Sequence, residues 1–390
     1  MAIEVGKNDL KEVVRSLGPQ GFLAMLDTSL TEKKMKPEQV SIAELWRACT
    51  GDAPISSYTT LEDDFRTIAE TTIKEDLNAM GSTLFAKATG ALINSKVRDA
   101  FDITPAIGER LVTTIPSKLK NETIVGFTNM DTVEEVDEGG EYPQVGFQEL
   151  YFTVTNKKYG AIISITEETI KFDQTALILD RAGRIGERAR LFKEKTIVEA
   201  VFGPAVASAT NSVFKPLGTA AILYGTAART TLAQGGTGGA NGATGHTDIN
   251  HASLQAITTL VMEQYGEQGT TDFINLAMQG WILLTPWELY DEAWETVTTP
   301  KTPFSNDNAE NFWRQFRYVP LSSPFLTSAT TWLLGDFRKD FVWTEVFPLQ
   351  VFRLARGTEI EFTRDIVAAY KVRLMGGIGA IDYRHSYKCE

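Results

Sequence analysis

Residues 131–143 of this chain read D-T-V-E-E-V-D-E-G-G-E-Y-P, an acidic stretch in which two glycines and a proline interrupt regular structure. Residues 159–166 follow with the alternating pattern of a strand, Y-G-A-I-I-S-I-T. The stretch 173–202 then has helical periodicity until Gly203 and Pro204 end it. A long exposed loop followed by a long helix is typical of a protein that reaches across its neighbours, and not of one that encloses a substrate.

The helix predicted over 173–202 carries one apolar stripe. Asp173 is a suitable N-cap, and about 30 helical residues would span roughly 45 Å at about 1.5 Å each. Gly183 and Gly186 lie inside the helix, where each costs about 1 kcal/mol relative to alanine. We therefore expect another backbone to approach closely at these glycines, or the helix to bend slightly. The stripe consists of residues that recur at steps of four and three: Ile178, Ala182, Ile185, Ala189 and Phe192.

Short strand-like runs flank the acidic stretch on both sides. Residues 111–127 contain L-V-T-T-I-P and E-T-I-V-G-F, which precede it. Residues 147–156, F-Q-E-L-Y-F-T-V-T-N, follow it, and the strand over 159–166 comes next. Together these runs predict a long two-stranded arm with a charged tip.

The tip of the predicted arm carries six carboxylates within eleven residues and no basic residue. Three interpretations stay open: a solvated loop tip, a salt-bridging contact to the basic face of a neighbouring subunit, and a site for a hard cation such as calcium. The alternating D-x-D-x-D-G pattern of a dedicated calcium loop is absent. The carboxylates are those of Asp131, Glu134, Glu135, Asp137, Glu138 and Glu141.

Residues 1 to about 100 have mostly helical patterns. A first amphipathic helix is predicted to end at Gly18 and Pro19, and a second begins with Pro37 near its start. A third helical pattern covers 61–77. The region is interpreted as a helical arm or subdomain. The alternative is a segment that directs assembly before a shell matures.

The rest of the chain mixes loops, helices and strands. The glycine-rich run 235–245 is predicted to be a flexible loop, with a helix starting near Asp248. A buried strand W-I-L-L-T-P precedes a helix that has Pro286 in its first turn. Four strand-like runs close the chain, with a turn at Arg356 and Gly357: T-W-L-L-G-D-F, F-V-W-T-E-V-F, L-Q-V-F-R-L and I-V-A-A-Y-K-V-R-L-M-G-G.

The composition is that of a globular protein of 390 residues with a net charge of −12. The charge argues against a surface built to grip nucleic acid tightly, although not against a shell that contains DNA. The two cysteines, Cys49 and Cys389, give no disulfide framework. The first residues lack an apolar signal core, and no apolar run is long enough to span a membrane.

Catalytic signatures are absent from the sequence. It contains no phosphate-binding P-loop, G-x-S-x-G, H-E-x-x-H or C-x-x-C motif. His246, Asp248 and His251 lie close together in sequence, but no fourth ligand of metal-site spacing stands nearby, so Asp248 is interpreted as a helix cap. Cys49 is interpreted as a core residue rather than a nucleophile. We therefore expect no catalytic, cofactor-binding or metal residues.

The order of these elements resembles the major capsid proteins of tailed bacteriophages, which have the Hong Kong 97-type fold. The resemblance covers roughly 110–390 and is carried by a pattern of elements and phrases rather than by a catalytic motif. The phrases are V-D-E-G-G-E-Y-P (136–143), Y-G-A-I-I-S-I-T-E-E-T-I (159–170), F-D-Q-T (172–175), G-R-I-G-E-R-A-R-L-F-K-E-K-T-I-V-E-A-V-F-G (183–203), L-L-G-D-F (333–337) and T-E-I-E-F-T-R-D-I-V-A-A-Y-K-V-R (358–373).

The resemblance implies an α+β fold with an extended β-hairpin loop, a long spine helix, and peripheral and axial domains. Residues 1–110 would form a helical N-terminal arm or subdomain, a region that many relatives lose by proteolysis and that we expect to be retained here. Residues 111–204 would hold the extended loop and the spine helix of the peripheral domain. Residues 205–345 would be mainly the axial domain, and 346–390 would be strands that return to the peripheral domain.

The function implied by the resemblance is that of a major capsid (head) protein of the virion, which is structural and not enzymatic. Copies would self-assemble in the host bacterial cytoplasm into hexamers and pentamers of an icosahedral shell around weakly contacted double-stranded DNA. Further partners would be a portal and possible decoration or scaffolding proteins, with no cofactor and no membrane. The candidate subunit-contact residues are Glu134, Glu135, Asp137, Glu138, Glu141, Arg184 and Arg188.

Two alternatives stay open, of which only the second belongs to another class of protein. An encapsulin-like compartment would share the fold, but such relatives typically lack so long an N-terminal region. A nucleotide- or sugar-handling enzyme could use the glycine-rich loop, but the missing phosphate motif and the presence of only three histidines count against it.

Overall fold

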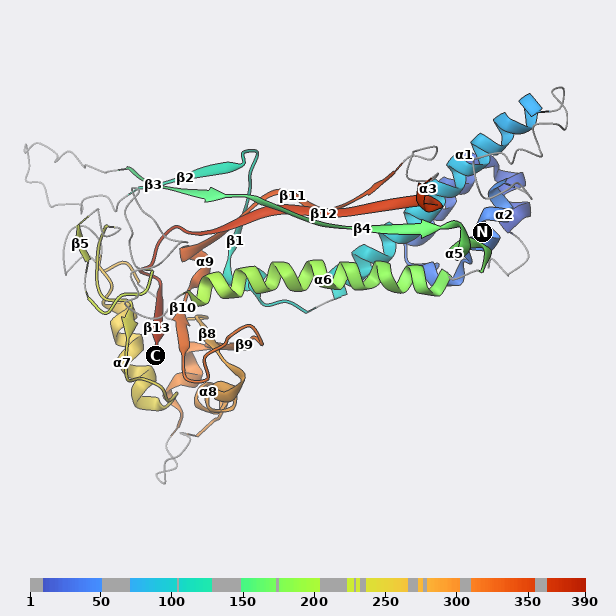
Figure 1. Cartoon of the computed structure of the whole chain (residues 1–390). Helices are drawn as coiled ribbons and strands as arrows, with labels where there is room; N and C mark the ends of the chain where they lie inside the picture. Colours follow the sequence, from blue (N-terminus) through green and yellow to red (C-terminus); the bar gives the residue numbers. More distant parts are fainter. Residues whose placement is uncertain are drawn as a thin grey trace, which may run out of the picture. The chain divides into compact units, whose positions relative to one another are not determined.

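The chain divides into two compact units in the computed structural model (Figure 1). The first unit comprises Met1–Pro105, Lys158–Leu191 and Pro348–Leu374, and the second comprises Ala106–Lys157, Phe192–Phe347 and Met375–Glu390. Helix α6 (Thr175–Phe202) and strands β11 (Phe341–Arg353) and β12 (Ile366–Ala380) contribute residues to both units. The structure describes residues 10–50, 71–103, 105–127, 149–172, 175–203, 223–227, 229–231, 236–265, 273–275, 279–301, 310–354 and 363–390.

The first unit begins with helix α1 (Leu10–Thr31), which bends sharply at Gly18. Gly18 has φ 69° and ψ 171°, a conformation that suits glycine and ends the hydrogen-bond ladder there. Pro19 then opens a new helical turn, where its missing N–H group is not needed. The predicted break at Gly18 and Pro19 is confirmed, but the sequence did not indicate that the chain resumes as a helix up to Thr31.

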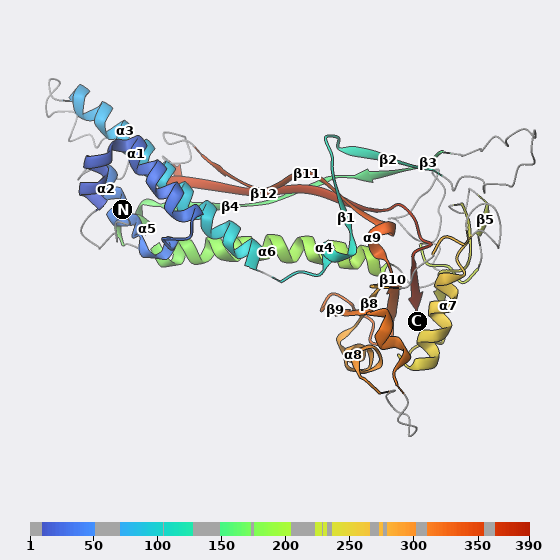
Figure 2. The ribbon, with the colours of Figure 1, turned by 180° about the vertical axis from the view of Figure 1, so that it is seen from behind.

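The remaining helices of the first unit are short except for α3 (Thr71–Ile103), which crosses α6 at an angle in Figure 2. Pro37 does lie at the start of a helical turn, the 3₁₀ helix η1 (Pro37–Gln39), and α2 (Ile42–Thr50) follows it. Of the helical pattern predicted over 61–77, residues 61–70 lie outside the described part of the chain. Helix α5 (Glu167–Lys171) completes the set, with Thr166 as its N-cap.

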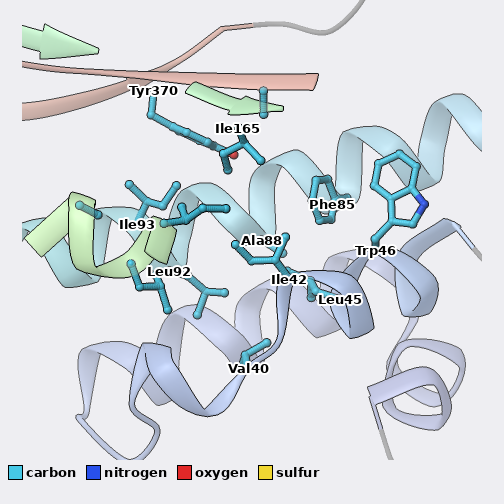
Figure 3. Close-up of a cluster of buried hydrophobic side chains, with 14 of the residues drawn as sticks. Val40, Ile42, Leu45, Trp46, Phe85, Ala88, Leu92, Ile93, Ile165 and Tyr370 are labelled. Carbon is cyan, nitrogen blue, oxygen red and sulfur yellow. The ribbon is translucent and has the colours of Figure 1, made fainter. Parts of the chain in front are cut away.

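The core of the first unit is almost wholly apolar (Figure 3). Phe85 on α3 packs edge-on against Trp46 on α2, with ring centroids 4.8 Å apart. Ile165 and Tyr370 extend this core from strands β4 (Lys157–Thr166) and β12. The Tyr370 hydroxyl donates a hydrogen bond of 3.1 Å to the Ala86 carbonyl oxygen, so the one polar group of that side chain is satisfied inside the core.

The strands that the sequence predicts on either side of the acidic stretch belong to two different sheets. Among the described strands, β2 (Asn121–Phe127) and β3 (Glu149–Thr155) pair only with each other, in antiparallel register from Asn121 opposite Thr155. This confirms a two-stranded arm. Strand β4 is not part of the arm, because it closes a four-stranded sheet of order β1-β11-β12-β4, in which β1 is Thr113–Pro116. The two runs predicted near 341–354 form the single strand β11.

The second unit contains a five-stranded sheet of order β7-β13-β10-β8-β9. Its strands β8 and β10 are buried along their whole length because both faces of the sheet are covered. Leu283 faces one cluster with helix α7 (His251–Met262) and helix α8 (Tyr290–Thr298), and its neighbour Leu284 faces another with the end of α6. The sheet is built from β7 (Gly242–Ala243), β13 (Ser386–Cys389), β10 (Trp332–Gly335), β8 (Ile282–Thr285) and β9 (Val319–Ser322).

The glycine-rich run 235–245 is more ordered than the sequence indicated. It contains β6 (Gly236–Gly238), which pairs with β5 (Arg229–Thr231), and β7, which pairs with β13. The buried Asn241 side chain accepts a hydrogen bond from the Gly225 N–H and donates to the Leu223 and Tyr383 carbonyl oxygens. Backbone hydrogen bonds from Gly242 to Gly225 and from Gly245 to Glu390 hold the same run. The prediction of a loop is therefore wrong for Gly236–Gly238 and Gly242–Ala243, which form strands.

The helix predicted near Asp248 begins three residues later. Asn250 is the N-cap of α7, and its side chain accepts a hydrogen bond of 2.9 Å from the Ser253 N–H, so Asp248 is not the cap. Pro286 directly precedes the 3₁₀ helix η5 (Trp287–Leu289), close to its predicted place. The turn predicted at Arg356 and Gly357 lies outside the described residues. The remaining elements are α4 (Gly108–Leu111), η6 (Phe312–Phe316) and α9 (Phe337–Asp340).

Candidate subunit-contact surface

Helix α6 is fixed in the first unit by close packing against α3. A Cβ atom added at Gly186 would lie 2.3 Å from the Val97 carbonyl oxygen, and one at Gly183 would lie 3.3 Å from the Lys96 Cε atom. The expectation that these glycines allow another backbone to approach closely is therefore confirmed at Gly186. Asp173, the predicted N-cap, lies outside the described residues, and the described helix starts at Thr175.

The opposite face of α6 is exposed and carries three arginines, with the exposed carboxylates of Asp180 and Glu187 at its edge. Arg181, Arg184 and Arg188 recur at steps of three and four, so they lie on one side of the helix, and we call them the basic stripe. Leu177 and Leu191 continue the same face and are also exposed. This exposed face of α6 thus combines the three guanidinium groups of the basic stripe with two apolar side chains, while the other side of the helix is buried.

The arginines of the basic stripe are only weakly engaged within their own chain. Arg184 Nε lies 2.9 Å from an Asp180 carboxylate oxygen, but both side chains are more than half exposed, so the pair is worth about 0.2–0.5 kcal/mol. Arg181 and Arg188 make no ion pair within the described residues. Guanidinium groups in this state are available to carboxylates from outside the chain.

A groove of about 390 Å³ runs beside the stripe within the first unit. Its wall includes an ion pair between Lys96 and Glu38, and the hydrogen bond from Lys96 holds the pKa of the Glu38 carboxyl below its usual value. The groove is therefore lined by both signs of charge. Its charged lining residues are Glu38, Lys96, Asp99, Asp180, Arg184 and Glu187.

The acidic candidates Glu134, Glu135, Asp137, Glu138 and Glu141 lie outside the described residues. The base of their arm, in the second unit, is fixed by Asn156. Its amide donates to Ser117 Oγ at 2.9 Å and to the Leu119 carbonyl oxygen at 2.8 Å, and it accepts from Thr344 Oγ1 at 2.6 Å. The strands that lead to residues 128–148 therefore start from a rigid, hydrogen-bonded base.

The residues singled out for possible chemistry do not form a reactive centre. His251 packs its ring against Trp313, and the His246 carbonyl oxygen accepts a hydrogen bond from Trp332 Nε1. No group of three metal-ligating side chains gathers anywhere in the described residues. Burial raises the pKa of the Cys49 thiol to about 12, which disfavours the thiolate that nucleophilic attack requires.

One acidic residue of α6 has a role that the sequence did not reveal. Glu194, in the second unit, is buried and accepts hydrogen bonds of 2.9 and 2.7 Å from the N–H groups of Ile107 and Gly108. It thereby satisfies donors at the start of α4. The sequence carries no signal for this contact, because the partners lie more than 80 residues apart. In contrast, the spacing of Arg181 from Arg184 would have identified the third arginine of the stripe.

No helix among the described residues is both long and apolar enough to cross a membrane.

The chain is similar to known viral shell proteins. A family model described as phage capsid protein matches residues 151–389. No curated protein matches the sequence.

Several solved shell structures are also similar to this chain. A virus-like particle from Pyrococcus furiosus has 9% identity and a TM-score of 0.42, with 76% of this chain and 98% of that chain covered. The capsid of an empty GTA particle has 13% identity and a TM-score of 0.47, with 73% and 89% covered. The capsid of the cyanophage P-SCSP1u has 10% identity and a TM-score of 0.45, with 73% and 88% covered.

Proposed function

This chain belongs to the phage capsid protein family, and we propose on that premise that its copies form hexamers and pentamers of an icosahedral shell around double-stranded DNA. The observation that carries the proposal is the family match, which extends over 151–389 and so includes both the long helix and the five-stranded sheet. A protein of this family is a structural component of the virion. Beyond membership of the family, we propose the arrangement of the copies in the shell and the double-stranded DNA inside it.

The contacts between copies would involve the acidic tip of the arm and the basic stripe of α6. The tip carries six carboxylates with no local base, and the stripe carries Arg181, Arg184 and Arg188 on an exposed face. Opposite charges on two surfaces of one chain favour association between copies and fix their register. The candidates named from the sequence, Arg184 and Arg188, are the central members of this surface.

The domain organisation of the chain would follow that of Hong Kong 97-type shell proteins. Residues 111–204 would supply the extended loop and spine helix of a peripheral domain, and 205–345 mainly an axial domain around the capsomer axes. Residues 1–110 would be an N-terminal helical subdomain, and 346–390 would return to the peripheral domain. A subunit whose loop lies on its neighbour would bury a large, mostly polar area, and a closed shell repeats each such contact in every copy.

The enclosed DNA would be contacted weakly, and the other partners would be a portal and possible decoration or scaffolding proteins. The net charge of −12 supports this, because tight phosphate binding requires clustered lysine and arginine and becomes strongly salt-dependent. Weak contact suits a shell that must pack DNA and later release it. Assembly would take place in the bacterial cytoplasm.

The test is size-exclusion chromatography of the purified full-length chain, with negative-stain microscopy of each peak. We expect closed particles, or rings of five and six copies. Monomers or dimers of 43.1 kDa subunits under all conditions would overturn the proposal. Cryo-electron microscopy of particles from infected cells would then test for five-fold vertices and enclosed DNA. A shell filled with a cargo enzyme would favour an encapsulin-like compartment instead.

A further inference from the structure

Helix α8 and the preceding η5 present an exposed row of aromatic side chains, which we call the aromatic ladder: Trp287, Tyr290 and Trp294. Trp287 and Trp294 are 74% and 49% exposed. The Trp287 and Tyr290 rings are parallel within 7° and lie 5.6 Å apart, and the Tyr290 and Trp294 rings lie 6.3 Å apart. Exposed tryptophans in a continuous row are unusual on a monomer and mark an interaction surface.

The ladder is not a loosely packed part of the core. Ala293 and Val297 on the other side of α8 are buried in the apolar cluster of the second unit. Thr296 donates a hydrogen bond of 3.2 Å from its hydroxyl to the Ile249 carbonyl oxygen. The helix is therefore held by its inner face, and the ladder is displayed on a rigid element.

The ladder carries an acidic rim without counter-charge. Residues 281–300 contain four carboxylates, those of Glu288, Asp291, Glu292 and Glu295, and no lysine, arginine or histidine. None of the four makes an ion pair within the part of the chain that the structure describes. The surface as a whole is aromatic at its centre and negative at its edge.

The neighbouring η6 displays the complementary chemistry. Phe312 is 52% exposed, Arg314 and Arg317 are exposed, and residues 311–320 contain no carboxylate. Neither arginine forms an ion pair with any described residue. Arg317 has φ 54°, a left-handed conformation that a non-glycine residue adopts at a cost of about 1 kcal/mol.

This arginine surface is also rigidly supported. Asn311 accepts a hydrogen bond of 3.0 Å from the Trp313 N–H and donates to the Thr296 and Thr299 carbonyl oxygens at 2.7 and 3.0 Å. These bonds join the start of η6 to the end of α8. The acidic and basic surfaces are thus fixed on adjacent elements of the same unit, and their charges do not pair with each other within the described chain.

We propose that the aromatic ladder and its acidic rim bind the Phe312–Arg314–Arg317 surface of a second copy of this chain. The inference rests on the proposed function, since it assigns one of the contacts by which copies associate. Guanidinium groups stack on tryptophan faces and pair with carboxylates at the same time, so both halves of the surface are used. Because both surfaces lie on neighbouring elements, two copies related by a two-fold axis would make the contact twice.

The experiment reverses the charges on each surface of the full-length chain. One variant is D291R/E295R, the other is R314E/R317E, and the readout is the assembled fraction by sedimentation velocity, with particles identified by negative stain. Each variant alone is expected to lower the assembled fraction about tenfold. An equimolar mixture of the two should recover to within about threefold of wild type, because each reversed surface then meets opposite charge on the other copy.

The control is E263R, at an exposed carboxylate of the same unit that makes no ion pair with any described residue, and it should assemble like wild type. A second variant, W287A/W294A, removes only the exposed rings and should also lower assembly about tenfold with an unchanged circular dichroism spectrum. A mixture that assembles no better than its components would overturn the inference, as would normal assembly of W287A/W294A. If the wild type forms particles and all the variants assemble equally well, this inference alone is overturned. If the wild-type chain forms no particles, the proposed function is overturned together with this inference.

Discussion

The two compact units bury different kinds of side chain. Among the described residues of the first unit, the buried polar side chains are those of Thr89 and Thr175. All the other buried polar and charged side chains in the described chain belong to the second unit, and they include Asp340, Arg384 and Lys388. We attribute the difference to how each unit satisfies its backbone polar groups.

The reason is the type of secondary structure. The first unit is mainly long helices, which satisfy their own backbone groups and need only apolar faces to pack. The second unit joins short strands by turns, and its unpaired backbone groups need partners. Asn241 and Asn275 supply them, because each bonds to carbonyl oxygens from segments distant in sequence. Shape should therefore control the stability of the first unit, and buried hydrogen bonds that of the second.

The largest effect is expected at the close approach inside the first unit. Gly186→Ala places a Cβ atom 2.3 Å from the Val97 carbonyl oxygen, which is backbone and cannot move aside. We expect a loss of about 3 kcal/mol in the free energy of unfolding, measured by urea denaturation. Gly183→Ala is the matched control, since its new atom meets only the flexible Lys96 side chain and gains up to about 1 kcal/mol of helix propensity. If both substitutions change the free energy of unfolding equally, the stability of the first unit is not controlled by the shape of its packed surfaces.

The next effect tests the hydrogen bonds of the second unit. Asn241→Ala leaves the Gly225 N–H and the Leu223 and Tyr383 carbonyl oxygens without their buried partner. We expect a loss of about 2–3 kcal/mol in the free energy of unfolding. The exposed N-cap Asn250→Ala should cost only about 1 kcal/mol in the same urea titration. A cost at Asn241 no greater than that at Asn250 would argue against buried hydrogen bonds as the main support.

A third prediction concerns charges that the first unit keeps outside its core. R184E/R188E should change the free energy of unfolding by less than about 0.5 kcal/mol, because both side chains are exposed. The same variant should lower the assembled fraction about tenfold, which corresponds to about 1.4 kcal/mol. Sedimentation velocity measures the second effect and urea denaturation the first. K34E/K87E, which reverses two other exposed lysines of the unit, is the control.

The smallest effect is a pH dependence that belongs to the second unit. Burial lowers the pKa of His385 below its ordinary value of 6.5, although Asp382 opposes the shift. The unfolded chain therefore binds a proton first as the pH falls, so the contribution to stability is complete above pH 6.5 and is lost below it. The slope is less than about 1.4 kcal/mol per pH unit.

The substitution His385→Asn removes the titrating group and so isolates its contribution to the pH dependence of stability. An asparagine at this position can still face Asn275, whose Oδ1 atom lies 2.7 Å from His385 Nδ1. Urea denaturation between pH 7 and pH 5 should give the variant a weaker loss of stability than wild type. If the free energy of unfolding depends on pH in the same way in both proteins, His385 does not cause the pH dependence.

Much of the local structure was predictable from the sequence. The sequence located α6 through its helical period, its apolar stripe through Ile178 and Ala182, and the stop at Gly203. The predicted start lies two residues before the described start, and the predicted end is the observed one. The buried strand β8 and the helix after it were also found. These features depend on neighbours in sequence, which is why periodicity and capping residues reveal them. The family recognised from the ordered phrases of the sequence is confirmed by the family match.

The candidate surfaces were only partly predictable. Arg184 and Arg188 were named, and Arg181 could have been added from its spacing. The ladder residues recur at helical spacing in W-E-L-Y-D-E-A-W, but apolar residues at that spacing usually face a core. Only the packing of Ala293 and Val297 inward shows that Trp287 faces out.

Elements that depend on local period and turn chemistry, such as α6 and the break at Gly18, could be read from the sequence alone, and so could the family. Tertiary structure alone decided which strands pair, since β4 joined β12 and not the arm. It also decided the structure of the glycine-rich run, where Asn241 donates a hydrogen bond to a carbonyl oxygen 142 residues away and β7 pairs with β13. The physical reason is that pairing and burial depend on contacts between distant segments, and a single sequence records the residues but not which of them meet.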